Sequence, residues 1–338
     1  MHNLLKTKLW VSTRQFRNYI LWALAMGCTC AAQAQVTGAG SSLVRDLMAS
    51  WTAQFAAASG GVSYDPAGSS AGVARASDQS VDFGATDVAL TTAALRQAGL
   101  KQLPIAVTAV AVIVNLPELN GKTIKLNGDI LADIYQGAIK EWNHSQIAAS
   151  NPGVALPNKP IVPIWRTDGS GQSYALSAYL ARGNSKWRRS IAATSNLSLT
   201  VGKGVRGGQA MIDTVKITVG AIGYEPLGAA QKSGLVIAQL QNAAAKSIAP
   251  NAASIALALD SAQWSQDSNS ADLDGSEGPG TYPLTAVTYA LVPATLKAGR
   301  KNALPFIQTA IAQGDALAKQ AGFVPLSATG KAMVAAMR

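Results

Sequence analysis

The sequence predicts an α/β fold, because strand-like and helix-like stretches alternate along most of its 338 residues. Two long apolar runs, residues 104–117 and 283–293, are rich in Val and Thr and bounded by proline, which is typical of buried strands. The 165 residues between Pro117 and Pro283 are too many for a simple connection. This spacing predicts one lobe inserted into another, with the two runs as crossing strands.

Residues 1–34 are predicted to be a signal peptide. Four basic residues and no acidic ones precede the apolar run YILWALAMGCTCAA. That run has 14 residues, fewer than the ~20 that a membrane-spanning helix needs. The small residues of "AQA" favour cleavage after Ala34 and export to the periplasm. Processing as a lipoprotein anchored at Cys28 is the alternative.

The remaining residues form a moderately basic chain without cysteine. The whole sequence has 28 Lys and Arg against 18 Asp and Glu, and removing the four early basic residues leaves a formal charge of +6. A hydrophobic content of 48% with 14% charged residues excludes a disordered chain. The basic residues are scattered apart from "KWRR" (186–189), which is more typical of a solvated helix face, so we expect no nucleic-acid partner.

The shorter elements follow in chain order. Leu43, Leu47, Trp51 and Phe55 recur every four residues and predict the buried stripe of a helix. "GVSYDPAG" and "SVDFGATD" predict short strands that end in small residues, and the face of Ala175, Leu176, Tyr179 and Leu180 predicts a second helix. The polar, acidic stretch 265–282 lacks the spacing of a calcium loop and predicts a solvated linker.

Three stretches rich in glycine and serine each begin a predicted helix: TGAGSSL (37–43), AGSSAGV (67–73) and DGSGQS (168–173). The first turn of a helix has unpaired N–H groups and a partial positive charge, and glycine lets a ligand approach the backbone. A single stretch of this kind is usually an ordinary helix cap. Three of them, with Arg166 beside one, suit a small oxyanion held by converging helix ends.

The same stretches resemble those of the periplasmic phosphate-binding proteins of high-affinity phosphate ABC importers, the PstS family. GAGSSL before a Trp-bearing helix, AGSSAGV followed by VDFGATDVALT, and GAIGYEP are similar to family motifs. GDILADIYQGAIKEWN together with NPGVALPNKPIVPIWRTDGSGQS is the most specific part, and the likeness covers nearly the whole chain after the signal peptide.

The resemblance implies a two-lobed type II periplasmic binding protein, with the ligand in a cleft between lobes and the crossing strands as the hinge. Lobe 1 would consist of residues 35–112 and 287–338, and lobe 2 of residues 113–286.

The resemblance also implies a set of phosphate ligands. Matched position by position, these are Ser42, Leu43, Ser69, Asp87, Arg166, Ser170, Gly171 and Gln172, with Asp168 supporting Arg166. Leu43 stands where an aromatic residue is common, which matters little if only its N–H is used. Gln172 replaces the usual threonine, so one hydroxyl donor is lost.

The implied function is to bind inorganic phosphate in the periplasm and deliver it to an ABC permease and its ATPase. We expect a monomer without enzymatic activity, cofactor or metal. A binding protein for another tetrahedral oxyanion, or a secreted phosphate scavenger or sensor without a transporter, is the alternative.

Two rival interpretations come from other motifs. "GKGVRG" (202–207) fits the dinucleotide pattern G-x-G-x-x-G, but "GAIGYEP" begins too soon after it for a full βαβ unit, so a structural loop is favoured. A hydrolase would need Ser170 as nucleophile and His144, the one histidine after the signal peptide, as base. Asp168 stands where the nucleophile motif has its first glycine, which disfavours that interpretation.

Overall fold

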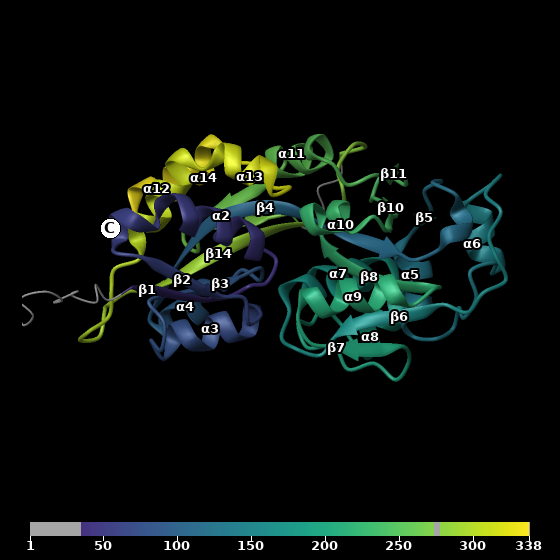
Figure 1. The fold of residues 1–338 in the computed structure, drawn as a ribbon, viewed down its shortest axis with the longest axis horizontal. Helices are drawn as coiled ribbons and strands as arrows, with labels where there is room; N and C mark the ends of the chain where they lie inside the picture. Colours follow the sequence, from purple (N-terminus) through teal and green to yellow (C-terminus); the bar gives the residue numbers. More distant parts are fainter. Residues whose placement is uncertain (1–34, 274–277, 338) are drawn as a thin grey trace, which may run out of the picture.

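The computed structural model describes residues 35–273 and 278–337. The predicted signal peptide, its cleavage after Ala34 and the alternative anchor at Cys28 lie outside the described residues. Two lobes lie side by side and are joined by the long strands β4 (Leu100–Val114) and β14 (Thr285–Pro293) (Figure 1). The prediction of a two-lobed α/β fold is confirmed.

One mixed sheet continues through both lobes. Its strand order is β2-β1-β3-β14-β4-β8-β6-β7, and β9 pairs with β4. β1 is parallel to β2 and β3 in one lobe, and β6 is parallel to β7 and β8 in the other, whereas β4 and β14 run antiparallel to their neighbours. The two parallel groups therefore sit on either side of an antiparallel centre.

The crossing strands were predicted correctly. β4 pairs with β14 from Leu100 to Ala109, and with β8 from Val110 to Val114, so a single strand passes from one lobe to the other. All of β4 except Lys101 is buried. Burial on both faces explains why the run is almost continuously apolar rather than alternating. The hydroxyl of Thr108 donates to the carbonyl oxygen of Gly322 at 2.7 Å, which satisfies a polar group in the core.

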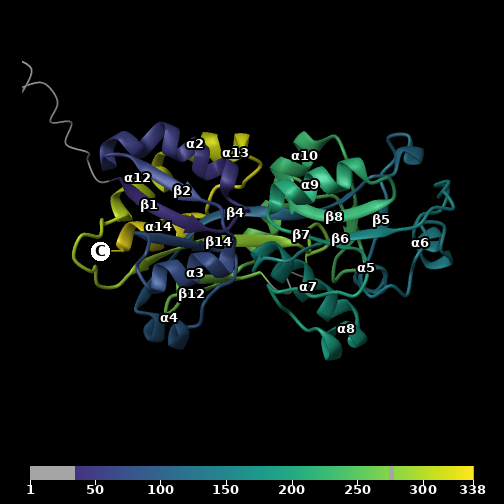
Figure 2. The same cartoon turned by 60° about the horizontal axis from the view of Figure 1, so that its bottom comes forward.

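The first lobe combines the start and the end of the chain. Its N-terminal elements are β1 (Val36–Gly40), α2 (Arg45–Phe55), η1 (Ala56–Ser59), β2 (Val62–Asp65), α3 (Ser69–Ser77), β3 (Phe83–Thr86) and α4 (Thr92–Ala98). Its C-terminal helices are α12 (Leu304–Gln313), α13 (Asp315–Gln320) and α14 (Ala328–Ala336). These helices lie beside α2 on one face of the sheet, whereas α3 and α4 lie on the other face (Figures 1 and 2).

The second lobe is built from the middle of the chain. Its elements up to β6 are η2 (Pro117–Leu119), β5 (Lys125–Leu126), α5 (Gly128–Tyr135), α6 (Ser145–Ser150) and β6 (Val162–Arg166). Next come α7 (Gly171–Gly183), α8 (Ser185–Ser190), β7 (Lys203–Val205), α9 (Gly208–Ile217) and β8 (Ala221–Pro226). The last are α10 (Leu227–Ser233), β9 (Val236–Ile237), β10 (Gln239–Gln241) and β11 (Ser247–Ile248).

The helical stripes predicted from the sequence are present. In α2, Leu47 and Trp51 are buried, and the helix packs against α12 and α13. Removing a leucine side chain of this size from water contributes about 1.5–3 kcal/mol. Leu176 and Leu180 of α7 are fully buried in the same way. Among the described residues no helix is both long and apolar enough to span a membrane.

The stretch predicted as a solvated linker is partly structured, so that prediction was wrong. After α11 (Ala252–Asp260), β12 (Gln263–Ser265) and β13 (Ser270–Asp272) form an antiparallel pair. The side-chain amide of Gln102 in β4 donates to the carbonyl oxygen of Ser268 at 2.7 Å, and the N–H of Ala271 donates to the hydroxyl of Tyr289 in β14 at 3.1 Å. These long-range contacts hold the polar stretch against the crossing strands, and its own sequence contains no sign of them.

Candidate functional site

The predicted site residues gather where the carboxyl ends of the parallel strands of both lobes meet. Ser42 follows β1, Ser69 follows β2 and Asp87 follows β3, whereas Arg166 is the last residue of β6. Ligands of open α/β sheets commonly bind at the carboxyl ends of the strands. The sequence left open whether the three glycine-serine stretches converge, and the structure brings them together.

Asp87 is surrounded by hydroxyl groups. Its carboxylate accepts from Ser41 at 2.6 and 2.7 Å, from Thr288 at 2.6 Å and from Ser69 at 3.1 Å. The Ser41 hydroxyl accepts from the N–H of Leu43 at 3.0 Å and donates its one proton to Asp87. A carboxyl group that receives three O–H donors is set up as an acceptor.

Burial nevertheless raises the pKa of Asp87 above its usual value, while the three hydroxyls and Arg166 act in the opposite direction. Removing a carboxylate from water disfavours its charged form, and hydrogen bonds to that form favour it. We therefore expect Asp87 to become protonated at a higher pH than an exposed aspartate.

Arg166 supplies the positive charge of the site, and its side chain is completely buried. Its Nε donates to one carboxylate oxygen of Asp168 at 2.7 Å and an Nη donates to the other, a two-pronged pairing that orients the guanidinium. The other Nη donates to Ser42 Oγ at 3.1 Å and to Gln172 Oε1 at 3.4 Å. Burial lowers the pKa of Arg166, but the bonds to Asp168 outweigh it and leave that pKa raised.

Asp168 is held by contacts on two sides. Burial raises its pKa, but the hydrogen bond and charge of Arg166 outweigh burial and leave the pKa lowered. Its Oδ1 also accepts from the N–H of Gly207 at 3.0 Å. Asp168 therefore stays ionised, which suits its predicted role of supporting Arg166.

The two lobes touch at this site. The N–H of Gly171, the first residue of α7, donates to Ser69 Oγ at 3.2 Å, and the N–H of Ser70 donates to the carbonyl oxygen of Gly169 at 3.1 Å. A Cβ added to Gly171 would come within 2.4 Å of Asp87 Oδ2. Glycine is therefore required here by the close approach of the first lobe, and the helix starts of α3 and α7 meet where the lobes touch.

Gln172, the departure from the family pattern, has a side chain that points into this site. It is 1% exposed, and its Oε1 accepts from Arg166. An arginine side chain only donates, so Nε2 must be the other atom of the amide, and this buried Nε2 has no hydrogen-bond partner among the described residues. An unpaired buried donor is costly, and it is the kind of group that an anion would satisfy.

Two further predicted residues already have local partners. Ser170 is the cap of α7, and its hydroxyl accepts from the N–H of Ser173 at 3.3 Å. The N–H of Leu43 donates to Ser41, as described above, and the leucine side chain is buried in the core.

Ser41 and Thr288 were not predicted from the sequence as residues of this site. The position of Ser41 within TGAGSSL was a usable signal. Thr288 lies 201 residues from Asp87 in a buried apolar run, and no local pattern marks it.

The residues of the rival interpretations have structural contacts of their own. In the G-x-G-x-x-G loop, the N–H of Gly207 donates to the carboxylate of Asp168, so the loop supports the Arg166 pair. His144 caps the short helix α6 through Nδ1, which accepts from Gln146. α6 lies at the far end of the second lobe, away from Ser170 at the start of α7 (Figure 1). Within residues 35–273 and 278–337, no cluster of three or more His, Cys, Asp or Glu side chains suits a metal ion.

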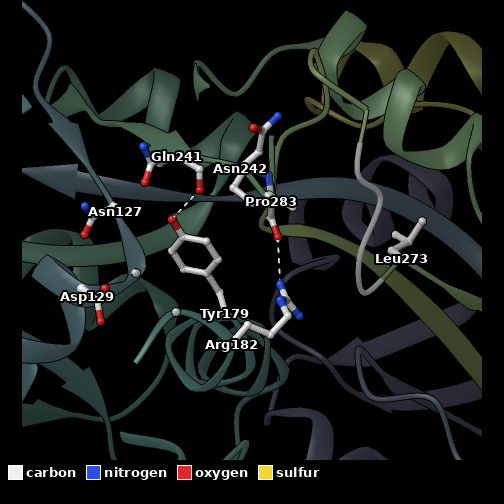
Figure 3. A pocket seen from close by; sticks show the side chains of 11 residues that line it. Asn127, Asp129, Tyr179, Arg182, Gln241, Asn242, Leu273 and Pro283 are labelled. Carbon is white, nitrogen blue, oxygen red and sulfur yellow. Dashed lines mark hydrogen bonds between the residues drawn. The ribbon is translucent and has the colours of Figure 1, made fainter. Parts of the chain in front are cut away.

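A pocket of about 330 Å³ lies elsewhere on the second lobe (Figure 3). Asn127 and Asp129 come from the start of α5, and Tyr179 and Arg182 from the last turns of α7. The Tyr179 hydroxyl donates to the carbonyl oxygen of Gln241 at 2.8 Å. With a rise of about 1.5 Å per residue, these turns of α7 are more than ten ångströms from the helix start that faces Arg166. The pocket is therefore separate from the predicted anion site.

Comparisons with known proteins agree with this architecture. Residues 29–309 match the PBP superfamily domain. The phosphate-binding protein PstS of Xylella fastidiosa strain Temecula1 is 34% identical over 299 residues, which cover 86% of this chain and 81% of that protein. The phosphate-binding protein PstS of Haemophilus influenzae is 31% identical over 316 residues and 91% and 93% of the two chains.

Solved structures support the fold. A high-affinity periplasmic phosphate-binding protein, PfluDING, solved with phosphate at pH 8.5, has a TM-score of 0.69 and 19% identity, covering 89% of this chain and 93% of its own. A candidate phosphate ABC transporter substrate-binding protein from Clostridium perfringens, solved with bound phosphate, has a TM-score of 0.62 and 18% identity over 87% and 100% of the two chains.

Proposed function

The chain belongs to the PstS family of phosphate-binding proteins, and from this premise we propose that it binds inorganic phosphate in the cleft between its lobes and delivers it to an ABC permease. The observation that carries the proposal is the meeting of Arg166, Asp87 and the starts of α3 and α7 at one buried place. Arg166 complements the negative charge of hydrogen phosphate, and Asp87 can accept its proton. The N–H groups at the helix starts can donate to its oxygens.

We propose the ligand set predicted above: Ser42, Leu43, Ser69, Asp87, Arg166, Ser170, Gly171 and Gln172, with Asp168 in support. Arg166 balances part of the anion's charge, and Asp168 fixes the plane of the guanidinium. The contacts of Ser42, Ser69 and Gly171 across the cleft link neutral donors of both lobes. Phosphate would take over these contacts, so each hydroxyl or N–H would exchange a partner within the protein for an anion oxygen.

Closure of the lobes would follow from this division of the ligands. We propose lobes of residues 35–112 with 287–338 and of residues 113–286, with the segment of β12 and β13 lying over the strands of the first lobe. β4 passes from its pairing with β14 to its pairing with β8 at Ala109 and Val110. Bending at this point would open the cleft as a hinge motion.

The setting that we propose is the periplasm, reached through a signal peptide, where a monomer would bind phosphate and deliver it to a permease and its ATPase. The proposal includes binding without catalysis. Ser170 caps α7, and His144 lies on α6 at the other end of the lobe, so no serine–histidine pair forms among the described residues.

Calorimetry on phosphate-stripped protein tests the function. We expect phosphate and its close analogue arsenate to bind and fully ionised sulfate to bind far more weakly, because sulfate has no proton for Asp87. Tighter binding of sulfate than of phosphate would make the chain a binding protein for another tetrahedral oxyanion. No binding of any of the three anions would contradict an oxyanion site.

Gln172 provides a prediction specific to this chain. Gln172→Met keeps the size of the side chain but removes the unpaired Nε2 donor, and a hydrogen bond to a charged group contributes about 1.5–3 kcal/mol. We therefore expect phosphate binding to weaken by about tenfold or more, measured by calorimetry. Gln172→Thr, which restores the family's hydroxyl, should bind more tightly than Gln172→Met.

Gln146→Met is the matched control, because Gln146 is exposed on the distant helix α6. If Gln172→Met and this control both bind within twofold of the wild type, the side chain of Gln172 does not contact the anion.

A further inference from the structure

A buried acid, Glu225, lies beside the site and takes part in none of the contacts described so far. It is on β8, is 2% exposed, and its Oε1 has no hydrogen-bond partner among the described residues. A Cβ on Gly208, the first residue of α9, would come within 3.0 and 3.1 Å of the two carboxylate oxygens. The carboxyl group is therefore enclosed between the sheet and the start of α9.

Glu225 and Arg166 both lie near the carboxyl ends of the neighbouring parallel strands β8 and β6. β6 and β8 are parallel, with Val162 opposite Ala221 and Pro163 opposite Ile222. The paired residues end there, and the same register counted onward gives Glu225 as the position opposite Arg166. The hydroxyl of Tyr224, one residue before Glu225, accepts from the N–H of Arg166 at 3.1 Å, so this part of β8 lies close to Arg166. Residues opposite each other in a sheet direct their side chains to the same face. The next residue back, Tyr224, faces the other way, where its hydroxyl contacts Ser173 at 2.6 Å.

Charged groups from both lobes act on Glu225. Burial is the largest influence and raises its pKa to about 8, Arg166 and Arg45 lower that pKa, and Asp168 and Asp46 raise it. Arg166 and Asp168 belong to the second lobe, whereas Arg45 and Asp46 begin α2 in the first. Arg45 is partly exposed and pairs with Asp46, and Arg166 pairs with Asp168, so neither cation forms an ion pair with Glu225 among the described residues.

The charges in the site show why this matters. If Glu225 is ionised, Arg166 faces three carboxylates, those of Asp87, Asp168 and Glu225, and a phosphate dianion would then enter a region that already has a net negative charge. If Glu225 is protonated, one of those charges is removed. Charges in a buried site are weakly screened, so this difference acts directly on the anion.

We propose that Glu225 is a charge-setting residue of the site and that its carboxyl group carries a proton when phosphate is bound. This inference rests on the proposed function. A bound dianion disfavours ionisation of a neighbouring carboxyl group, so phosphate and the proton on Glu225 stabilise each other. Phosphate binding is then accompanied by proton uptake in mildly alkaline solution.

The direction of the pH dependence follows from the same linkage. In the phosphate-free protein Glu225 loses its proton as the pH rises through about 8. In the complex it loses the proton at a higher pH. Between these two pH values, Glu225 must take up a proton when phosphate binds. The affinity for phosphate then falls by up to about tenfold for each unit that the pH rises.

The test is calorimetry with inorganic phosphate at about pH 7 and about pH 9 on the wild type and on Glu225→Gln, which has the same shape but no titration. We expect similar affinities at the lower pH. At the higher pH we expect the wild type to bind roughly tenfold more weakly than Glu225→Gln. Repeating the alkaline titration in two buffers of different ionisation enthalpy should reveal proton uptake by the wild type that Glu225→Gln lacks.

Glu141→Gln is the matched control, because Glu141 is exposed and distant from the cleft. It should retain the pH dependence of the wild type. If Glu225→Gln binds phosphate with the same pH dependence as the wild type, the inference is wrong while the proposed function stands. If the wild type binds no phosphate at about pH 7, the proposed function itself fails.

A second readout needs no ligand and covers a variant that folds poorly. The pKa of Glu225 is raised above that of an unfolded glutamate, so its contribution to stability is present in acid and is lost as the pH rises toward about 8. We expect the difference in melting temperature, Glu225→Gln minus wild type, to become more positive between about pH 5 and about pH 8.5. A constant difference contradicts a buried, titrating Glu225, and Glu225→Ala provides the same comparison if Glu225→Gln does not fold.

Discussion

Arg166→Ala is expected to weaken phosphate binding by roughly two orders of magnitude or more. The guanidinium is completely buried, and it is the cation that the structure places against Ser42 and Gln172 in the cleft. Removing one partner of a buried charged pair costs on the order of 3–5 kcal/mol. Without Arg166, the anion would be held by neutral donors beside the carboxylates of Asp168 and Asp87.

The measurement is calorimetry on phosphate-stripped protein, with thermal unfolding to verify that the substituted protein is folded. Arg189→Ala is the control, because Arg189 is exposed on α8 of the same lobe. Arg166→Lys retains the charge but not the two-pronged pairing with Asp168, so we expect it to bind more tightly than Arg166→Ala and more weakly than the wild type. A loss of less than about tenfold in Arg166→Ala would place the anion elsewhere.

Asp87→Asn is expected to reduce selectivity rather than abolish binding. The two oxygens of a carboxylate offer about four acceptor positions. Ser41, Ser69 and Thr288 supply three hydroxyl protons to it, one fewer than the carboxylate can accept, so it can also take the proton of hydrogen phosphate. Fully ionised sulfate has no such proton, so its oxygen would face the carboxylate without a hydrogen bond. Rejection by an unpaired buried group reaches factors of about 10⁴–10⁵.

We therefore expect the wild type to prefer phosphate over sulfate by at least roughly a thousandfold. Asp87→Asn can donate as well as accept, so it should narrow the gap mainly by binding sulfate more tightly. Competition calorimetry with both anions measures the ratio. Asp65→Asn, an exposed aspartate that pairs with Arg75, is the control. Full discrimination in Asp87→Asn would remove Asp87 as the selecting residue.

Acid provides an independent check on Asp87. Burial raises the pKa of its carboxyl group, so protonation begins at a higher pH than for an exposed aspartate. A protonated Asp87 can donate to sulfate, and the preference for phosphate should decrease as the pH falls. The change in preference that we expect for Asp87 occurs as the pH falls, whereas the loss of phosphate affinity that we propose for Glu225 occurs as the pH rises. One pH series can therefore distinguish the two groups.

Much of the site was predictable because its residues lie in short motifs at strand ends. Glycine and serine before a helix indicate available N–H donors from local sequence alone, and Arg166 stands within two residues of Asp168. Thr288 was not predictable in this way. Within an apolar strand a threonine looks like any β-branched residue, and only the pairing of β14 with β3 brings it to Asp87.

Glu225 was likewise not predictable from its local sequence. Its sequence context, GAIGYEP, matched the family, but nothing in those letters indicates a carboxyl group buried beside a cation. The prediction of a linker over residues 265–282 failed for a related reason. Ser268 is held by Gln102, 166 residues away, and Ala271 by Tyr289 of β14.

The sequence by itself determined the alternating α/β elements, the two crossing strands and the three helix starts with Arg166 beside one of them. Each of these depends on neighbours along the chain, through the period of burial or the chemistry of a turn. Only the tertiary structure decided that Ser69 meets Gly171, that Thr288 meets Asp87 and that Glu225 is buried near Arg166. Those contacts arise from strand order and register, which residues far apart along the chain set together when the sheet forms.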